Sequence, residues 1–331
     1  MDQRVDIIGN PHDKLGQKIL NVLLKDKTTK KNIIWATNDY KLLGDEYASS
    51  MQIFPSLIAG FNGYIIRPRV EKSKDEQSAR IKNKAEVFTP SWVCNKQNNL
   101  IDDAWFERTG TFNIETDNGW IATTDKIVFP EGKTWQDYIK LKRLEISCGE
   151  APYLVSRYDT VTGKPIPIEQ RVGLLDRKLR IVCENCDSEP EWVEWAVKAV
   201  QNVYGFDWQG DNVLIARENI LFTFADYYAY KFTVPAIPEY LMEIAKIVAW
   251  NIFQMDGINF VIPNSCHDDT ETQLTTSGEK TTRYQCPGCK SGNHSLHNGV
   301  YAKTYDWSHD HSLTFYSLVE SASGGKAHAK I

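Results

Sequence analysis

Hydrophobic residues recur three and four residues apart in several stretches of the chain, a spacing that places them on one face of a helix. In residues 14–31 the apolar positions are Leu15, Ile19, Leu20, Leu23 and Leu24. Asp13 precedes this run as a candidate N-cap. Residues 189–203, 211–224 and 239–257 show the same spacing. We therefore expect a helix in each stretch, the third capped by Asp211 and the last ending in a short strand.

Short runs of β-branched and aromatic residues lie between these helices. Residues 32–37 (NIIWAT), 141–147 (LKRLEIS) and 203–207 (VYGFD) are expected to form strands. The segment between positions 69 and 84 is highly charged and predicts an exposed helix or connection. Because strands alternate with helices in the second half of the chain, the pattern favours an α/β sheet.

Composition divides the chain into three parts. Residues 1–84 form a helical, basic region, residues 85–260 hold the alternating strands and helices, and residues 261–331 are rich in Cys, His, Gly and Ser. The first 100 residues carry 16 Lys and Arg against 11 Asp and Glu, and the rest carry 22 against 32. If the protein binds a nucleic acid, we expect the contact in the basic amino-terminal third of the chain. A mildly basic segment is also a common solvated surface, so both readings stand.

The overall composition narrows the class of protein. The chain has 331 residues, of which 42% are hydrophobic and 11% aromatic, values typical of a packed globular protein. No run reaches the 18 uncharged apolar residues of a membrane helix, and the first residues lack the basic and apolar regions of a signal peptide. We expect a cytoplasmic protein with no membrane partner, whose seven cysteines serve as thiols or metal ligands.

The segment that follows the predicted strand 141–147 carries the first candidate site. Its sequence is Leu-Glu-Ile-Ser-Cys-Gly-Glu-Ala-Pro-Tyr-Leu, residues 144–154. A glycine after a strand permits a tight turn that lets the backbone approach a ligand. The string resembles the cofactor loop of adenine-N6 DNA methyltransferases, although Ala151-Pro152 replaces the second glycine of that family. The resemblance implies that the methionine end of S-adenosylmethionine is lined by Glu145, Cys148, Gly149 and Glu150.

Two further acids end predicted strands. Asp207 resembles the ribose-binding acid of the same family, and a carboxylate can accept hydrogen bonds from both ribose hydroxyls. A helix-capping role for Asp207 stays open. Residues 251–257 resemble the family's third strand end, which implies that Asp256 binds the adenine amino group; a simple turn acid fits equally well. The segment between Gly149 and Asp207 is longer than usual, and we expect residues 154–186 to be a surface excursion.

Residues 85–93 (Ala-Glu-Val-Phe-Thr-Pro-Ser-Trp-Val) resemble the Phe-Thr-Pro segment that precedes the cofactor loop in gamma-group adenine methyltransferases. In that family a helix amino terminus closes over the methionine carboxylate, and free N–H groups at such a terminus favour an anion. The resemblance assigns this role to Phe88, Thr89 and Pro90. An ordinary Thr-Pro helix start is the alternative. The resemblance covers residues 80–260 and implies a Rossmann-like methyltransferase sheet.

The family's base-binding segment, a polar residue followed by Pro-Pro and an aromatic residue, is not recognisable. The chain has 13 prolines and no two are adjacent. Two weak catalytic candidates are Asn10, in Ile-Gly-Asn-Pro-His, and Asn264, in Ile-Pro-Asn-Ser. The segment has therefore degenerated, or another chain supplies it, or the protein does not methylate DNA.

Cys286-Pro-Gly-Cys289 is a pair of cysteines spaced for one tetrahedral ion. Cys266 lies twenty residues earlier and His297 eight residues later, which completes a four-ligand set with His267 and His294 as alternates. A closed set of this kind indicates a structural zinc site in a small zinc-knuckle-like module. Reduced cysteines without a metal are the alternative. Cys183 and Cys186 form a second pair without nearby partners.

Together these patterns predict an α/β protein with a helical amino-terminal region, a methyltransferase-like core and a carboxy-terminal module with structural zinc. The first hypothesis is an enzyme, an S-adenosylmethionine-dependent DNA adenine-N6 methyltransferase or a methylase component of a restriction-modification system. The second is an inactive homologue that binds cofactor or DNA beside a catalytic or specificity subunit. DNA is the expected partner in both.

Overall fold

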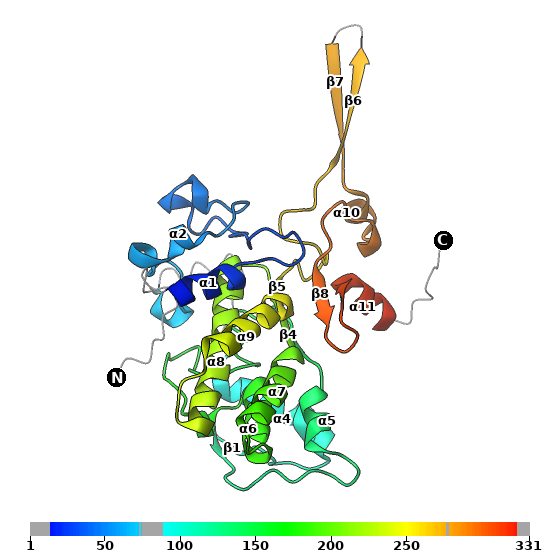
Figure 1. Cartoon of the computed structure of the whole chain (residues 1–331). Helices are drawn as coiled ribbons and strands as arrows, with labels where there is room; N and C mark the ends of the chain where they lie inside the picture. Colours follow the sequence, from blue (N-terminus) through cyan, green and yellow to red (C-terminus); the bar gives the residue numbers. More distant parts are fainter. Residues whose placement is uncertain (1–13, 73, 75–88, 276–277, 323–331) are drawn as a thin grey trace.

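A computed structural model describes residues 14–72, 74, 89–275 and 278–322, and it shows a mixed α/β protein (Figure 1). Its α-helices are α1 (Lys14–Leu23), α2 (Pro55–Ile58), α4 (Ser91–Phe106), α5 (Trp135–Lys140), α6 (Leu174–Asn185), α7 (Glu189–Gln201), α8 (Gly210–Phe232), α9 (Pro238–Asn251), α10 (Pro287–Ser291) and α11 (Phe315–Ala322). Its strands are β1 (Asn113–Thr116), β2 (Gly119–Ala122), β3 (Arg143–Glu145), β4 (Val203–Asp207), β5 (Ile252–Gln254), β6 (Asp269–Thr275), β7 (Gly278–Tyr284), β8 (Lys303–Asp306) and β9 (His311–Thr314).

The central sheet has three parallel strands in the order β3-β4-β5. Short hairpins form the other sheets of the described residues: β1-β2, β6-β7 and β8-β9. The strands predicted over 141–147 and 203–207 and the helix-to-strand passage from α9 to β5 are confirmed. Three strands establish an α/β arrangement with small sheets, whereas a doubly wound Rossmann-like sheet stays a prediction.

The two faces of the central sheet have different partners. Val203 and Ile252 belong to the main core, which α6, α7, α8 and α9 help to form. Phe206 and Phe253 are paired across β4 and β5 and belong instead to a small cluster with Phe315 of α11. The carboxy-terminal module therefore covers one face of the sheet, and the helices cover the other (Figure 1).

The expectation that residues 154–186 form a surface excursion is wrong, because α6 lies in the core. Leu175 and Leu179 are fully buried, and so are the charged residues Arg177 and Lys178. The Arg177 Nη1 donates to Asp102 Oδ2 over 2.6 Å, and the Lys178 Nζ donates to the backbone oxygen of Ile139 over 2.8 Å. These bonds satisfy the buried charges, which is the condition for placing them inside a protein.

The amino-terminal part packs on the same core and differs from the prediction at two points. Residues 32–37 are not a strand; they form isolated bridges, such as Ile34 with Gln52. Asp211 does not cap α8, because Gln209 is the N-cap and the Asp211 carboxylate bonds to Tyr40 and Lys72. Asp13 lies outside the described residues.

The hairpin β6-β7 projects from the carboxy-terminal module away from the rest of the molecule (Figure 1). Its strands are antiparallel, with Asp269 opposite Tyr284 and Thr272 opposite Thr281. An isolated two-stranded hairpin has marginal stability in water. The contacts at the base of the β6-β7 hairpin therefore determine whether the hairpin is ordered.

Candidate functional site

Three acidic residues lie at or just beyond the carboxyl ends of the parallel strands. Glu145 ends β3, Asp207 ends β4, and Asp256 follows Gln254, the last residue of β5. Because the strands are parallel neighbours, their carboxyl ends share one edge of the sheet. Ligands of open α/β sheets bind outside this edge. Glu145, Asp207 and Asp256 therefore lie at the same edge of the sheet.

The loop after β3 has an unusual backbone. Ser147, Gly149 and Ala151 all have left-handed dihedral angles, with φ of 49°, 52° and 64°. The Gly149 amide donates to Asp207 Oδ2 over 2.9 Å, which ties the loop to β4. A β-carbon added at Gly149 would meet no atom within 4 Å. Gly149 is therefore needed for its conformation, and the space beside it is open to a ligand.

The side chains of Glu145 and Cys148 support this loop from within the protein. The Glu145 carboxylate accepts bonds from the amides of Tyr153 (3.3 Å) and Leu154 (3.2 Å). Burial raises the pKa of Glu145 to about 8, although these amides lower it in part. Cys148 is buried beside Gly205, where an added β-carbon would lie 3.1 Å from its sulfur atom, and burial raises the pKa of its thiol.

Glu150 is also engaged within the protein. Its Oε1 accepts a bond from the Arg69 amide, and its Oε2 accepts one from the Tyr158 hydroxyl, each over 2.6 Å. The cofactor-lining roles of Glu145, Cys148 and Glu150 stay predictions. All three side chains point inward, whereas Ile146 and Ser147 of the same loop are exposed.

Asp207 is the acid most closely joined to the loop. Its Oδ1 accepts bonds from the Gln209 amide (2.9 Å) and the Asn212 side chain (3.4 Å), while Oδ2 holds Gly149. Burial raises the pKa of Asp207 to about 6, against the lowering effect of these donors. A carboxylate has about four acceptor sites, so three donors leave room for one more bond. The half-exposed Trp208 follows directly.

Asp256 caps a turn. Its Oδ1 accepts bonds from the amides of Ile258 (2.8 Å) and Asn259 (3.1 Å), and its Oδ2 accepts one from the Asn259 side chain (2.8 Å). This is the turn-acid arrangement that the sequence left open. Contact with an adenine amino group stays a prediction.

The Thr-Pro segment does begin a helix. Pro90 is the N-cap of α4, and the Thr89 backbone oxygen accepts a bond from the Thr160 hydroxyl over 3.1 Å. The Ser91 amide donates to Asp159 Oδ2 over 2.9 Å. Burial alone would raise the pKa of Asp159, but the amide and hydroxyl donors outweigh it and lower the pKa. An anion from the chain itself therefore lies at this helix terminus. Phe88 falls outside the described residues.

Of the two weak catalytic candidates, the structure describes Asn264. Asn10 lies outside the described residues. Asn264 is exposed in a turn with φ of 60°, and its amide group lies 3.5 Å from the Ala36 oxygen and 3.4 Å from the Ser49 oxygen.

The four predicted metal ligands come together. The Cys266 sulfur lies 3.5 Å from that of Cys286, 3.7 Å from that of Cys289 and 3.7 Å from the His297 Nδ1. The His297 Nδ1 lies 3.7 Å from the Cys286 sulfur and 3.6 Å from the Cys289 sulfur. In a tetrahedron with Zn–S bonds of about 2.3 Å, two sulfur atoms are about 3.8 Å apart. The set can therefore hold a zinc ion.

Neighbouring groups fix these ligands. The Asn298 amide donates to the Cys286 sulfur over 3.3 Å. Burial raises the pKa of Cys286, but amide and side-chain donors outweigh it and lower the pKa to about 6. The His297 ring packs on Gly288, where an added β-carbon would lie 2.7 Å from it. These contacts favour the thiolate at Cys286 and leave no space for a side chain between residue 288 and the His297 ring.

The metal set lies at the base of the projecting hairpin, since Cys266 precedes β6 and Cys286 follows β7. The alternates His267 and His294 are not members of the set. Cys183 and Cys186 do not join it either; the Cys183 sulfur accepts a bond from the Trp192 ring nitrogen over 3.2 Å.

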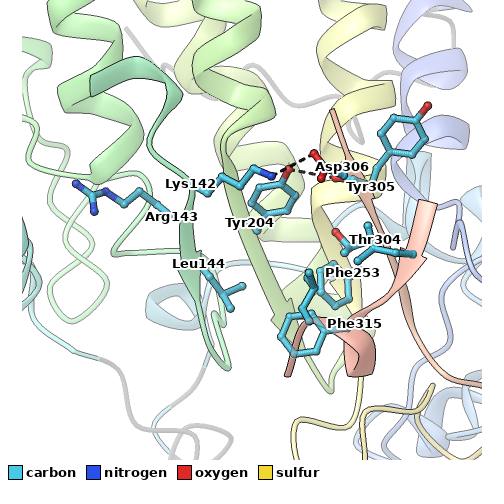
Figure 2. Close-up of a pocket in the computed structure, with 11 residues that line it drawn as sticks. Lys142, Arg143, Leu144, Tyr204, Phe253, Thr304, Tyr305, Asp306 and Phe315 are labelled. Carbon is cyan, nitrogen blue, oxygen red and sulfur yellow. Dashed lines mark hydrogen bonds and ion pairs between the residues drawn. The ribbon is translucent and has the colours of Figure 1, made fainter. Parts of the chain in front are cut away.

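Sequence reasoning missed a cavity of about 180 Å³ on the face of the sheet that the carboxy-terminal module covers. Residues from β3, β4 and β5 line it together with residues from β8, β9 and α11 (Figure 2). The alternation of Tyr204 and Phe206 in β4 is a sequence signal for a second buried face. Nothing in the sequence shows which distant segment covers that face.

Within the described residues, no helix combines the length and apolar character needed to cross a membrane. Comparison of the chain with protein-family models, with curated protein sequences and with solved structures finds no match.

Proposed function

We propose that this protein binds S-adenosylmethionine at the carboxyl edge of β3 and β4 and acts as a DNA adenine-N6 methyltransferase or as the methylase component of a restriction-modification system. One observation carries the proposal: the Gly149 amide is bonded to Asp207 across the ends of two adjacent parallel strands. A glycine turn next to an acid on the neighbouring strand is the arrangement that nucleoside ligands use in open α/β sheets.

The chain's own groups have distinct roles in this proposal. The open space beside Gly149 admits the ligand close to the backbone. The acceptor site left on Asp207 receives a ribose hydroxyl. S-adenosylmethionine supplies the methyl group when it is bound. Glu145 and Glu150 act indirectly, because their buried bonds keep the loop in its left-handed conformation.

The missing Pro-Pro segment favours a second function, an inactive homologue that binds cofactor or DNA beside a catalytic subunit. Asn264 is held by backbone oxygens at Ala36 and Ser49 in an exposed turn, without a neighbouring aromatic ring in its motif. Base-modifying enzymes need a polar group and a stacking surface for the flipped base. This function predicts cofactor binding without methyl transfer.

We also propose that Cys266, Cys286, Cys289 and His297 hold a structural zinc ion. The spacing of the four ligand atoms supports this assignment. Because all four positions of a tetrahedron are filled by protein atoms, such a site leaves no position for a substrate. Its role is to fasten the base of the β6-β7 hairpin.

The experiment that separates the two functions is transfer of a labelled methyl group from S-adenosylmethionine to double-stranded DNA, followed by identification of the methylated base. The first function predicts N6-methyladenine with the wild type and its loss in Asp207→Ala. The matched control is Asp125→Ala, which replaces an exposed acid outside β3, β4 and β5. This variant should keep activity. Wild-type binding without transfer would favour the second function, and RNA and protein are tested as acceptors in parallel.

A further inference from the structure

The cavity on the module-covered face of the sheet is mainly apolar. Figure 2 shows rings and aliphatic side chains facing one another across it. The apolar and aromatic lining residues include Leu144, Tyr204, Phe253, Leu313, Phe315 and Leu318. The module is fastened beside it by two bonds: the Tyr204 hydroxyl to the Tyr305 oxygen (3.1 Å) and Lys142 to Asp306 (3.1 Å). The cavity is therefore a fixed feature of the packed module.

The volume of the cavity sets the size of its occupant. Its volume of about 180 Å³ slightly exceeds the roughly 150 Å³ of an apolar cavity that binds benzene. It is smaller than the ~300 Å³ at which pockets for whole small molecules begin. One aromatic side chain fits this space, and a nucleoside cofactor does not.

Among the lining residues, the Thr304 hydroxyl and the Arg143 Nε have no hydrogen-bond partner in the described residues, and Figure 2 shows the Arg143 side chain pointing away from the cavity. Thr304 is 4% exposed, and its hydroxyl makes no hydrogen bond within the part of the chain that the structure describes. In Figure 2 the hydroxyl oxygen of Thr304 lies on the side of Tyr204 and Phe253. A buried hydroxyl without a partner costs free energy, which a ligand that bonds to it would recover. The occupant should therefore carry a polar group that bonds to this hydroxyl, and a ring N–H is one such group because a hydroxyl oxygen accepts as well as donates.

The cavity opens beside an unpaired strand. Among the described residues the sheet ends at β3, and Leu144, which lines the cavity, is 45% exposed. The Arg143 amide donates to Asn202 on the β4 side. Because successive residues of a strand direct their N–H and C=O groups to opposite edges, those of Leu144 face outward. Ile146, two residues further, is 70% exposed.

Two basic residues lie just before the β3 edge in the sequence. Lys140 is exposed, and the Lys142 side chain is 52% exposed although it pairs with Asp306. An acidic flank on an incoming segment would complement these charges. An extended peptide can use both the outward backbone groups and this charge.

We propose that the β3 edge binds an extended segment of a partner protein, which adds to the sheet as a further strand, places one tryptophan ring in the cavity and carries acidic residues beside it. Strand addition supplies backbone bonds, and the side-chain cavity supplies specificity. The indole N–H donates to the Thr304 hydroxyl oxygen. An aromatic anchor in a central pocket is the usual source of affinity in such contacts.

The test uses the full chain and three probes: indole, 1-methylindole and the peptide acetyl-Asp-Thr-Trp-Thr-Asp-amide, each titrated by nuclear magnetic resonance. Indole is expected to bind at least fivefold more tightly than 1-methylindole, because only indole has the N–H group. Thr304→Val should abolish this difference. The peptide should bind at least tenfold more tightly than indole. Replacing the Trp of the peptide by Ala, or its two Asp by Lys, should weaken peptide binding.

Each contrary result overturns the proposal. Absence of indole binding would refute the cavity site, and equal binding of the two indoles would refute the role of Thr304. A peptide that binds no more tightly than indole would assign the cavity to a free aromatic molecule. Lys140→Glu, which changes an exposed residue outside the cavity lining, must weaken binding of the peptide and leave binding of indole unchanged.

Discussion

Substitution of Gly288 by alanine should disrupt the metal centre without removing any ligand. The added β-carbon would lie 2.7 Å from the Cγ, Nδ1 and backbone nitrogen of His297, whereas ordinary contact begins at 3.4 Å. The ring must therefore move by about 0.7 Å, which exceeds the ~0.2 Å tolerance of zinc–ligand distances. We expect zinc affinity to fall by about 10- to 100-fold, comparable to the loss of a supporting contact to a metal ligand.

The assay for this prediction is competition for zinc against a coloured chelator, with bound zinc measured by elemental analysis. Gly292→Asn is the matched control, since Gly292 has φ of 69° and no atom within 4 Å of an added β-carbon. Asn tolerates this conformation, so the control should bind zinc as the wild type does. Gly288→Ala affinity within twofold of the wild type would refute the geometric reasoning, and a wild type without zinc affinity would refute the site.

Three further predictions concern the sheet edge and the core. Burial raises the pKa of Asp207 to about 6, and protonation weakens the one acceptor site that is left for a ribose hydroxyl. S-adenosylmethionine affinity should therefore fall as the pH drops through 6, to roughly a tenth of its pH 8 value at pH 5; a flat calorimetric profile would contradict this. Gly149→Val should lower the same affinity at least about tenfold, because φ of 52° disfavours a branched residue; an unchanged dissociation constant would contradict it. Arg177→Ala should cost about 3 kcal/mol in urea unfolding, because it removes the 2.6 Å partner of the buried Asp102 carboxylate, which keeps the 3.2 Å pair with Arg143, and it also removes the buried bonds from Arg177 to Asn95 and Asn99; a loss under 1 kcal/mol would refute the importance of this pair.

Features with local signals were predictable from the sequence. The strands that end at Glu145 and Asp207 were predicted because their residues and the following turns are adjacent in the chain. The ligand set of Cys286, Cys289 and His297 with Cys266 was predicted because zinc chemistry restricts both residue types and spacing.

Features that depend on distant partners were not predictable. The unusual length of the segment between Gly149 and Asp207 made residues 154–186 look like a surface excursion. In the structure, Asp102 and the Ile139 carbonyl, far away in sequence, bond to Arg177 and Lys178 inside the core. The cavity beside Leu144 requires β8 and α11, which follow much later in the chain. No local pattern specifies such pairings, because they arise only when the elements pack.

The account's central claim is that Asp207 and Gly149 form a cofactor site at the carboxyl edge of the sheet. Calorimetric titration of S-adenosylmethionine into the wild type, Asp207→Ala and Asp125→Ala tests it most directly. We predict micromolar-range affinity in the wild type and the Asp125 control, with loss of at least about tenfold in Asp207→Ala, since a bond to a charged group contributes about 1.5–3 kcal/mol. Equal affinity in all three proteins, or binding in none, would contradict the claim.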